Sequence, residues 1–313
     1  MINLFHIPSH KIDTANYQNM LHDKVVVEFE EKIAKYVGAK YACSVNSATN
    51  AIFLTFLNAK TTVTVPSMIP PVVLNALITS GNKIKFKDNI DWVGDSYILH
   101  EFDNYKIVDS AQKVEKGQFI KECNDNDLLL LSFYPTKPIG GCDGGMILSN
   151  DYKKIKWFKE ATLNGMTFSN NNWERKISFP GYKMYMNSIQ AEIALNNFKS
   201  YENKLLKLKQ TRELYNEKLG YNNTSNHLYR IEMDGRDEFI KYAKDKGVTC
   251  GIHYEATHLN PVYSNHDSSF KLDLPKTEKN SKNTVSIPFH EKLTLTDTEM
   301  ITNIIKNFTD GNR

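Results

Sequence analysis

A continuous apolar run, a lysine, two glycine pairs and a second apolar run follow one another in "LLLLSFYPTKPIGGCDGGMILS", residues 128–149. A strand with one face in water alternates apolar and polar residues, whereas an uninterrupted apolar run is typical of a strand buried on both faces. Such strands lie in sheets that helices cover on both sides. The sequence therefore predicts a covered sheet, and it places the cation of Lys137 close behind one of its buried strands.

Short β-rich runs recur through the first half of the chain and alternate with helical patterns. We predict strands in "YACSVN", "TVTVP", "KIKF", "YKIVD", "DLLLLSFY" and "GGMILS". We predict a helix between Asp23 and Gly38, because apolar residues recur there at helical spacing, the aspartate can cap the start and the glycine can end it. This alternation predicts an α/β fold with a mostly parallel central sheet covered by helices.

The second half of the chain begins with a long helical pattern, from about Asn187 to Leu219, with at most one break. Beyond it, "HLYRIEM", a helix in "RDEFIKYAKDKG" and "VTCGIHY" are typical of a smaller α/β unit, which a helix in "DTEMITNIIKNF" closes. We therefore expect a large domain over residues 1–200 and a small C-terminal α/β domain over residues 201–313.

The composition excludes several classes of protein. The 39 basic and 36 acidic residues leave a net charge of +3, and no basic stripe suited to a nucleic-acid backbone is present. The four cysteines lie far apart and form neither a zinc motif nor a redox pair. The sequence shows no signal-peptide pattern and no apolar run of about 20 residues. We expect a cytoplasmic protein without nucleic-acid, membrane or metal partners.

Three polar features follow predicted strands at their carboxyl ends, where ligands bind in open α/β sheets. They are "SATN" at residues 47–50, Asp109 in "KIVDSAQ", and "SFYPTK" at residues 132–137. Each alone has an ordinary explanation, as a helix cap, a turn or a surface charge. Together they match the needs of pyridoxal phosphate: a lysine for the Schiff base, a carboxylate for the pyridinium nitrogen and a helix N-terminus for the phosphate.

In the same order, the chain resembles a known family, the DegT/StrS sugar aminotransferases. "FEEKIAKYVGAKYACSVNSATNAIFL" is similar to the family's opening helix and phosphate turn, "IVDSAQ" to its Asp-x-Ala-Gln box, and "SFYPTKPIGGCDGGMI" to its lysine motif. "GYKMYMNSIQAEIAL", "GIHYEATHLNPVY" and "SIPFHEKLT" are similar to its later signatures. The resemblance implies the type I fold of pyridoxal-phosphate-dependent transferases, which is the aspartate-aminotransferase fold.

The resemblance also implies a role for particular residues. Lys137 would carry the cofactor as a Schiff base and then act as general base, while ionised Asp109 would keep the ring nitrogen protonated. The other implied cofactor contacts are Ala48, Thr49, Asn50, Gln112, Ser132 and, from the neighbouring subunit, Tyr185. The implied substrate contacts are His253, Tyr254 and His258. A core position fits His253 equally well.

The chain departs from the family pattern at two places. Pro70 stands where the family commonly has an aromatic side chain that stacks on the cofactor ring. Tyr185, with Asn187 close behind, stands where the neighbouring subunit often sends an Asn or Arg to the phosphate. Both departures leave the cofactor contacts at these positions open.

The resemblance implies a homodimer with shared sites that moves an amino group from an amino acid, glutamate, to a nucleotide-linked keto-deoxysugar. The product would serve amino-sugar and surface polysaccharide biosynthesis, including lipopolysaccharide. Dehydratase relatives carry a histidine in place of the lysine, so Lys137 favours transamination. A regulatory or otherwise altered cofactor-binding relative is the alternative, and the sequence leaves open whether carbon 3 or carbon 4 is aminated.

Overall fold

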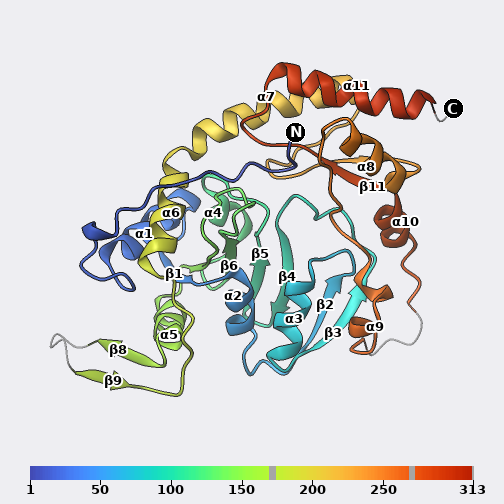
Figure 1. The fold of residues 1–313 in the computed structure, drawn as a ribbon. Coiled ribbons are helices and arrows are strands. Elements are labelled where there is room, and N and C mark those ends of the chain that lie inside the picture. The colour runs from blue at the N-terminus through green and yellow to red at the C-terminus, as the bar shows by residue number, and fades with distance from the viewer. Residues whose placement is uncertain (169–173, 268–271, 312–313) are drawn as a thin grey trace.

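The computed structural model describes residues 1–168, 174–267 and 272–311. At its centre lies a five-stranded sheet in the order β1-β7-β6-β5-β4 (Figure 1). Its strands are β1 (Tyr41–Val45), β7 (Gly145–Ser149), β6 (Leu128–Ser132), β5 (Tyr105–Asp109) and β4 (Tyr97–Phe102). A parallel pair, β2 (Thr62–Pro66) and β3 (Lys83–Lys87), lies beside it. All six runs that were predicted as strands form strands, and β4 is an addition.

The α/β class is confirmed, but the central sheet is mixed rather than mostly parallel. Strands β1, β6 and β5 run in one direction, whereas β7 lies antiparallel between β6 and β1, and β4 pairs antiparallel with β5. The physical reason is connection length, because a parallel neighbour needs a long crossover. Only residues 103–104 separate β4 from β5, and the connection from β6 to β7 contains no helix in the described structure.

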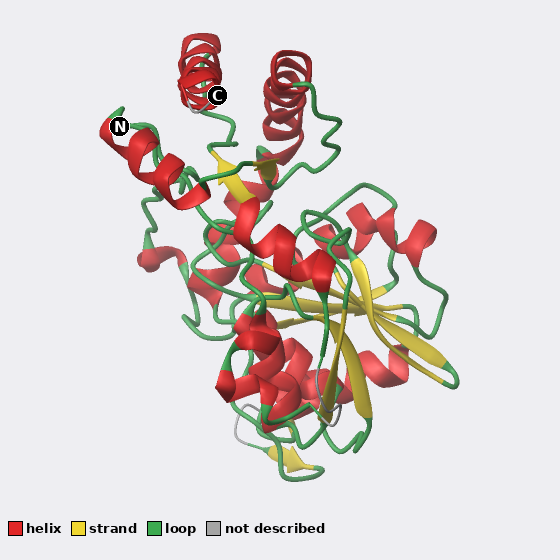
Figure 2. Ribbon diagram, turned by 90° about the vertical axis from the view of Figure 1, so that its right-hand side faces the viewer, coloured by secondary structure: helices red, strands yellow, loops and turns green. Residues whose placement is uncertain are grey.

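Helices cover both faces of the sheet, as the uninterrupted apolar run of β6 predicted (Figure 2). Leu128 and Leu130 join one core cluster with side chains of α2, α3 and α5, whereas Leu129 and Leu131 join another with side chains of α1 and α6. Full burial stabilises each such side chain by about 1.5–3 kcal/mol. The covering helices are α1 (Lys24–Val37), α2 (Ala48–Thr55), α3 (Pro71–Thr79), α5 (Tyr152–Thr162) and α6 (Ser188–Lys199).

The structure confirms the predicted start and end of helix α1 and the single break in the long helical pattern that follows Asn187. Helix α1 begins after Asp23 and ends at Gly38, whose φ of 84° is left-handed and suits glycine. The long helical pattern is two helices, α6 and α7 (Tyr201–Leu219), which meet at Ser200. Asn187 caps α6 through a capping box with Gln190.

A third core cluster lies wholly among C-terminal residues, and its partly buried margin includes Ile2 from the other end of the chain. Its elements are α7, β10 (Tyr229–Glu232), α8 (Arg236–Asp245), β11 (Thr284–Ile287) and α11 (Leu295–Gly311). Strands β10 and β11 pair antiparallel. "VTCGIHY" forms only isolated bridges, in which Val248 pairs with Ile2 and Gly251 pairs with Ser286 of β11. The division near residue 200 stays a prediction.

Short elements complete the described chain. They are η1 (Thr14–Asn16), α4 (Gln118–Glu122), β8 (Met166–Phe168), β9 (Arg175–Ile177), η2 (Thr257–Leu259), α9 (Pro261–Ser264) and α10 (Pro275–Asn283). Among the described residues, no helix combines the length and apolarity that a membrane span requires. No group of three potential metal ligands is found among them either.

Candidate active site

A cavity of about 390 Å³ opens at the carboxyl ends of β5 and β6. These two strands are parallel and Asp109 pairs with Leu130, so Asp109 and Ser132 emerge at the same edge of the sheet. The cavity brings together eight of the eleven predicted site residues: Ala48, Thr49, Asp109, Gln112, Ser132, Lys137, His253 and Tyr254. Asn50, Tyr185 and His258 do not line it.

Helix α2 points its N-terminus at this cavity. The Ser47 hydroxyl accepts a hydrogen bond from the Asn50 N–H (3.2 Å) and caps the helix, whereas the first-turn N–H groups of Ala48 and Thr49 have no acceptor within the helix. Gly145 lets β7 pass close by, since a Cβ there would lie 2.6 Å from the Ala48 nitrogen. The positive end of the helix and its unbonded N–H groups make an anion site.

The carboxylate of Asp109 forms part of the cavity lining and is held by two donors. The Ala111 N–H donates to Oδ1 (3.0 Å), and the Tyr97 hydroxyl donates to Oδ2 (2.9 Å). Burial raises the pKa of Asp109, while these two hydrogen bonds and the nearby Lys137 cation lower it. A cation placed in the cavity beside Asp109 would favour its ionised form.

Lys137 follows β6 in a turn, where its N–H donates to the Tyr134 carbonyl (2.9 Å). Burial lowers the pKa of its amine to about 8, and the charge of Asp109 offsets part of this effect. At pH 7 an amine with that pKa is unprotonated in about one molecule in ten, against about one in several thousand for an ordinary lysine. Lys137 is therefore suited to act as a nucleophile.

Gln112 and Tyr254 form a hydrogen-bonded pair on the cavity wall. The Gln112 Oε1 accepts from the Gly94 N–H (2.7 Å), and its Nε2 donates to the Tyr254 hydroxyl (2.8 Å). Burial raises the pKa of Tyr254, so its phenol stays neutral and keeps one proton to donate. Trp92 stacks on Tyr254 at 6.0 Å and 3°, and its indole N–H has no partner within the described part of the chain.

Two histidines face the cavity. His253 lies 2.9 Å from the Ser286 hydroxyl through Nδ1, and burial together with the Lys137 charge lowers its pKa to about 4, so it is neutral at pH 7. His227 stacks on Phe5 at 5.7 Å and 19°, and burial lowers its pKa well below the usual value. Both imidazoles can donate or accept a hydrogen bond without carrying a charge.

Two of the predicted site residues instead hold local structure together. The Asn50 amide donates to the Asn46 Oδ1 (2.7 Å). His258 is buried, with Nδ1 2.6 Å from the Ser67 hydroxyl and Nε2 3.3 Å from Glu278. A direct substrate contact by His258 stays a prediction that the cavity lining does not support.

Tyr185 also lies outside the cavity of its own chain. Its ring centroid is 4.4 Å from that of His22, and its backbone forms a bridge to Val45. Its neighbours Tyr182, Met184 and Met186 pack against the cores of the same chain. Any contact of Tyr185 with a cofactor therefore needs a second chain, and this role stays a prediction.

Three aromatic residues from outside the predicted set of site residues line the cavity: Phe5, Trp92 and His227. Each comes from a different part of the chain, and only the fold brings them together. An apolar wall of Pro70, Val72 and Val73 faces the same space, so the position expected to hold a stacking aromatic does border the cavity.

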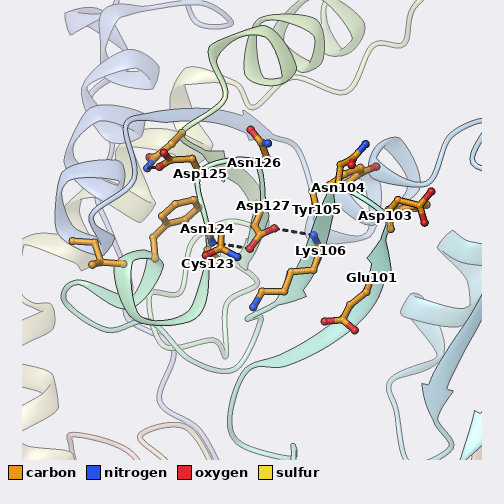
Figure 3. Close-up of a pocket in the computed structure, with 14 residues that line it drawn as sticks. Glu101, Asp103, Asn104, Tyr105, Lys106, Cys123, Asn124, Asp125, Asn126 and Asp127 are labelled. Carbon is orange, nitrogen blue, oxygen red and sulfur yellow. Dashed lines mark hydrogen bonds between the residues drawn. The ribbon is translucent and has the colours of Figure 1, made fainter.

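A larger hollow, about 920 Å³, lies at the opposite end of β5 and β6 and is lined by several carboxylates (Figure 3). Asp127 accepts hydrogen bonds from the backbone N–H groups of Lys106 (2.8 Å) and Asn124 (2.7 Å). Asp125 accepts from the Asn150 amide (2.6 Å). The carboxylates of this hollow therefore hold the surrounding loops in place through hydrogen bonds. The candidate active site is the smaller cavity.

The sequence pattern of the DegT/DnrJ/EryC1/StrS aminotransferase family matches residues 11–92 and 107–306. The chain belongs to this family. The match omits residues 93–106, the segment that contains β4.

Relatives of similar length and structure accompany this match. A Campylobacter jejuni protein named UDP-4-amino-4,6-dideoxy-N-acetyl-beta-L-altrosamine transaminase is 24% identical, over 89% of this chain and 88% of its own length. The aminotransferase TlmJ from Streptoalloteichus hindustanus superposes with a TM-score of 0.82 at 19% identity, over 100% of both chains. Spr1654 from Streptococcus pneumoniae, in a structure designated the PMP-form, has a TM-score of 0.80 at 17% identity, over 98% of this chain and 99% of its own. The type I fold is thereby confirmed.

Proposed function

We propose that this chain is a pyridoxal-phosphate-dependent sugar aminotransferase. It moves an amino group from glutamate to a nucleotide-linked keto-deoxysugar, in the synthesis of amino sugars for surface polysaccharides. The observation that carries the proposal is that Lys137, Asp109 and the N-terminus of α2 face one cavity. The name of the Campylobacter jejuni relative supports a nucleotide-linked amino sugar as the product class.

The residues present fit pyridoxal phosphate. The N-terminus of α2 suits a dianionic phosphate, which the N–H groups of Ala48 and Thr49 and the hydroxyls of Thr49 and Ser132 would hold. The buried carboxylate of Asp109 suits a cationic ring nitrogen. Lys137, with its lowered pKa, suits the aldehyde. Pro70 and Val72 would offer an apolar face to the ring where relatives commonly use an aromatic side chain.

When bound, pyridoxal phosphate supplies an aldehyde that captures amines and a ring that withdraws electrons from the adjoining carbon. Lys137 would hold the cofactor covalently, and its Nζ would take a proton from the carbon of the amino donor. Asp109, when ionised, would keep a proton on the ring nitrogen. Tyr254 and neutral His253 orient the sugar by hydrogen bonds, and the apolar wall excludes water.

The first expected result is amination of a nucleotide-linked sugar. The full-length protein, incubated with pyridoxal phosphate, glutamate and a panel of nucleotide-linked 3-keto and 4-keto sugars, should convert one member to its amine, with an equal amount of 2-oxoglutarate. Mass spectrometry identifies the product and the carbon. Loss of a hydroxyl instead of gain of an amine would identify a dehydratase, and no product from any sugar despite bound cofactor would favour a regulatory relative.

We also propose a homodimer whose chains share sites, in which Tyr185 reaches the partner's cofactor. Sedimentation should give twice the chain mass. A folded but inactive Tyr185→Ala chain mixed with inactive Lys137→Ala should regain activity, because one site of the hybrid receives both wild-type contributions. A fully active monomer would exclude shared sites, and confirmed hybrids without activity would exclude Tyr185 as the residue supplied by the partner.

A further inference from the structure

Tyr97 reaches the proposed cofactor-binding carboxylate from a segment outside the family match. Strand β4 pairs antiparallel with β5, and Tyr97 lies directly opposite Asp109 in the register. Directly opposite residues project from the same face of a sheet. The Tyr97 hydroxyl therefore meets Oδ2 of Asp109, at 2.9 Å.

The position of the Tyr97 ring is fixed by packing. Its centroid lies 4.6 Å from that of Trp92, whose own ring stacks on Tyr254. Burial and the charge of Asp109 raise the pKa of Tyr97, so its hydroxyl remains a proton donor throughout the working range of an enzyme. The Tyr97 hydroxyl therefore stays protonated and can donate a hydrogen bond, and the packing against Trp92 holds it in place.

The two donors at Asp109 constrain both oxygens of the carboxylate. An ionised carboxylate has about four lone-pair positions, and the Ala111 N–H and the Tyr97 hydroxyl occupy one on each oxygen. The plane of the carboxylate is thereby set, while lone pairs remain for a ligand in the cavity. We infer that Tyr97 is a positioning residue that orients the Asp109 carboxylate and keeps it anionic toward a cationic ring nitrogen.

This inference rests on the proposed function, and it names Tyr97 as the residue that keeps the Asp109 carboxylate ionised. A hydrogen bond from Tyr97 makes Asp109 a weaker base, so the shared proton stays on the ring nitrogen rather than moving to the carboxylate. The ionisable groups that face Asp109 are Tyr97, Lys137 and Tyr254. Because both phenols are neutral, Lys137 is the only cation among these three, and it would hold pyridoxal phosphate covalently.

The test uses pyridoxamine phosphate as a probe, because its amine cannot form the covalent bond with Lys137. Tyr97→Phe keeps the ring and removes only the hydroxyl. We expect this variant of the full-length protein to bind pyridoxamine phosphate about tenfold more weakly than wild type, the size expected for a lost hydrogen bond to a charged group. Titration by protein fluorescence measures the dissociation constant without any turnover.

The pH profile separates positioning from loss of structure. Removing the donor raises the pKa of Asp109 further, so the ionised form is lost at a higher pH as the solution is acidified. The variant's affinity relative to wild type should therefore fall further as the solution is acidified through the range in which Asp109 takes up its proton. A ratio that stays constant with pH would overturn the inference, because damage to packing has no reason to follow this titration.

Two further comparisons complete the design. In an Asp109→Asn background, Tyr97→Phe should have no additional effect, since its action passes through the carboxylate; an unchanged tenfold loss there would overturn the inference. Tyr105→Phe on β5, whose ring lines the remote hollow, is the matched control and should bind normally. Normal binding by Tyr97→Phe would refute the role of Tyr97 alone, whereas wild type that binds no cofactor would refute the proposed function as well.

Discussion

Lys137→Ala is expected to stop amino transfer, with kcat lower by at least about 10⁴-fold, the upper end of the contribution of a positioned general base. The loss should be this large because Lys137 acts twice, as the nucleophile that holds the cofactor and as the base that moves the proton. In the wild type, borohydride should fix pyridoxal phosphate covalently to the peptide that contains Lys137. In the variant this labelled peptide should be absent.

The control for this experiment is Lys209→Ala, which removes a well-exposed lysine from helix α7. It should retain both the labelled peptide and the wild-type rate. Labelling of any other lysine in the wild type would refute the assignment of Lys137, and so would a Lys137→Ala rate within about tenfold of wild type.

The position of Lys137 could be predicted because the information is local. An apolar run such as "LLLLS" must be buried on both faces, so whatever follows it emerges at the edge of the sheet. The same reasoning located Asp109 after "YKIV" and the helix start at Ser47. The structure confirms that these three positions meet at one cavity, because their strands end at the same edge.

The remaining walls of the cavity depend on contacts between distant parts of the chain. Phe5 stacks on His227 across more than two hundred residues, and no local pattern records such a pair. Tyr97 belongs to "YILHEF", whose pairing with β5 follows from the tight connection at residues 103–104 rather than from its own apolarity. The pairing of "VTCGIHY" also depends on distant residues, since Val248 bridges to Ile2 and Gly251 bridges to Ser286.

His258 illustrates how a family pattern can place a residue without fixing its contacts. The motif puts this histidine near the cavity, yet its ring lies between the Ser67 hydroxyl and Glu278, so both nitrogens already have partners. Sequence alone could not reveal this, because Ser67 is 191 residues away. Tyr185 differs, since its predicted partner is a second copy of the chain.

Asp109→Asn is the substitution that separates charge from shape at the proposed cofactor site. The amide has the size of the carboxylate and keeps one oxygen to accept from the Ala111 N–H or the Tyr97 hydroxyl. We expect borohydride labelling of Lys137 to survive, because the nucleophile is untouched. We expect both half-reactions to slow by about 10²–10³-fold, as when a preorganised electrostatic group is lost.

The two half-reactions, measured separately by stopped-flow absorbance with glutamate and with the keto sugar, test whether the loss is electrostatic. The ring nitrogen needs its ionic partner in both half-reactions, so the rates with glutamate and with the keto sugar should fall together. A displaced substrate pocket would instead slow one of the two half-reactions more than the other. Asp103→Asn in the exposed β4–β5 turn (Figure 3) removes a carboxylate remote from the cavity and should leave both rates unchanged. Near-normal rates in Asp109→Asn would mean that a group other than Asp109 binds the ring nitrogen. The hydrogen bond from Tyr97 to Asp109 would then have no role in binding the cofactor.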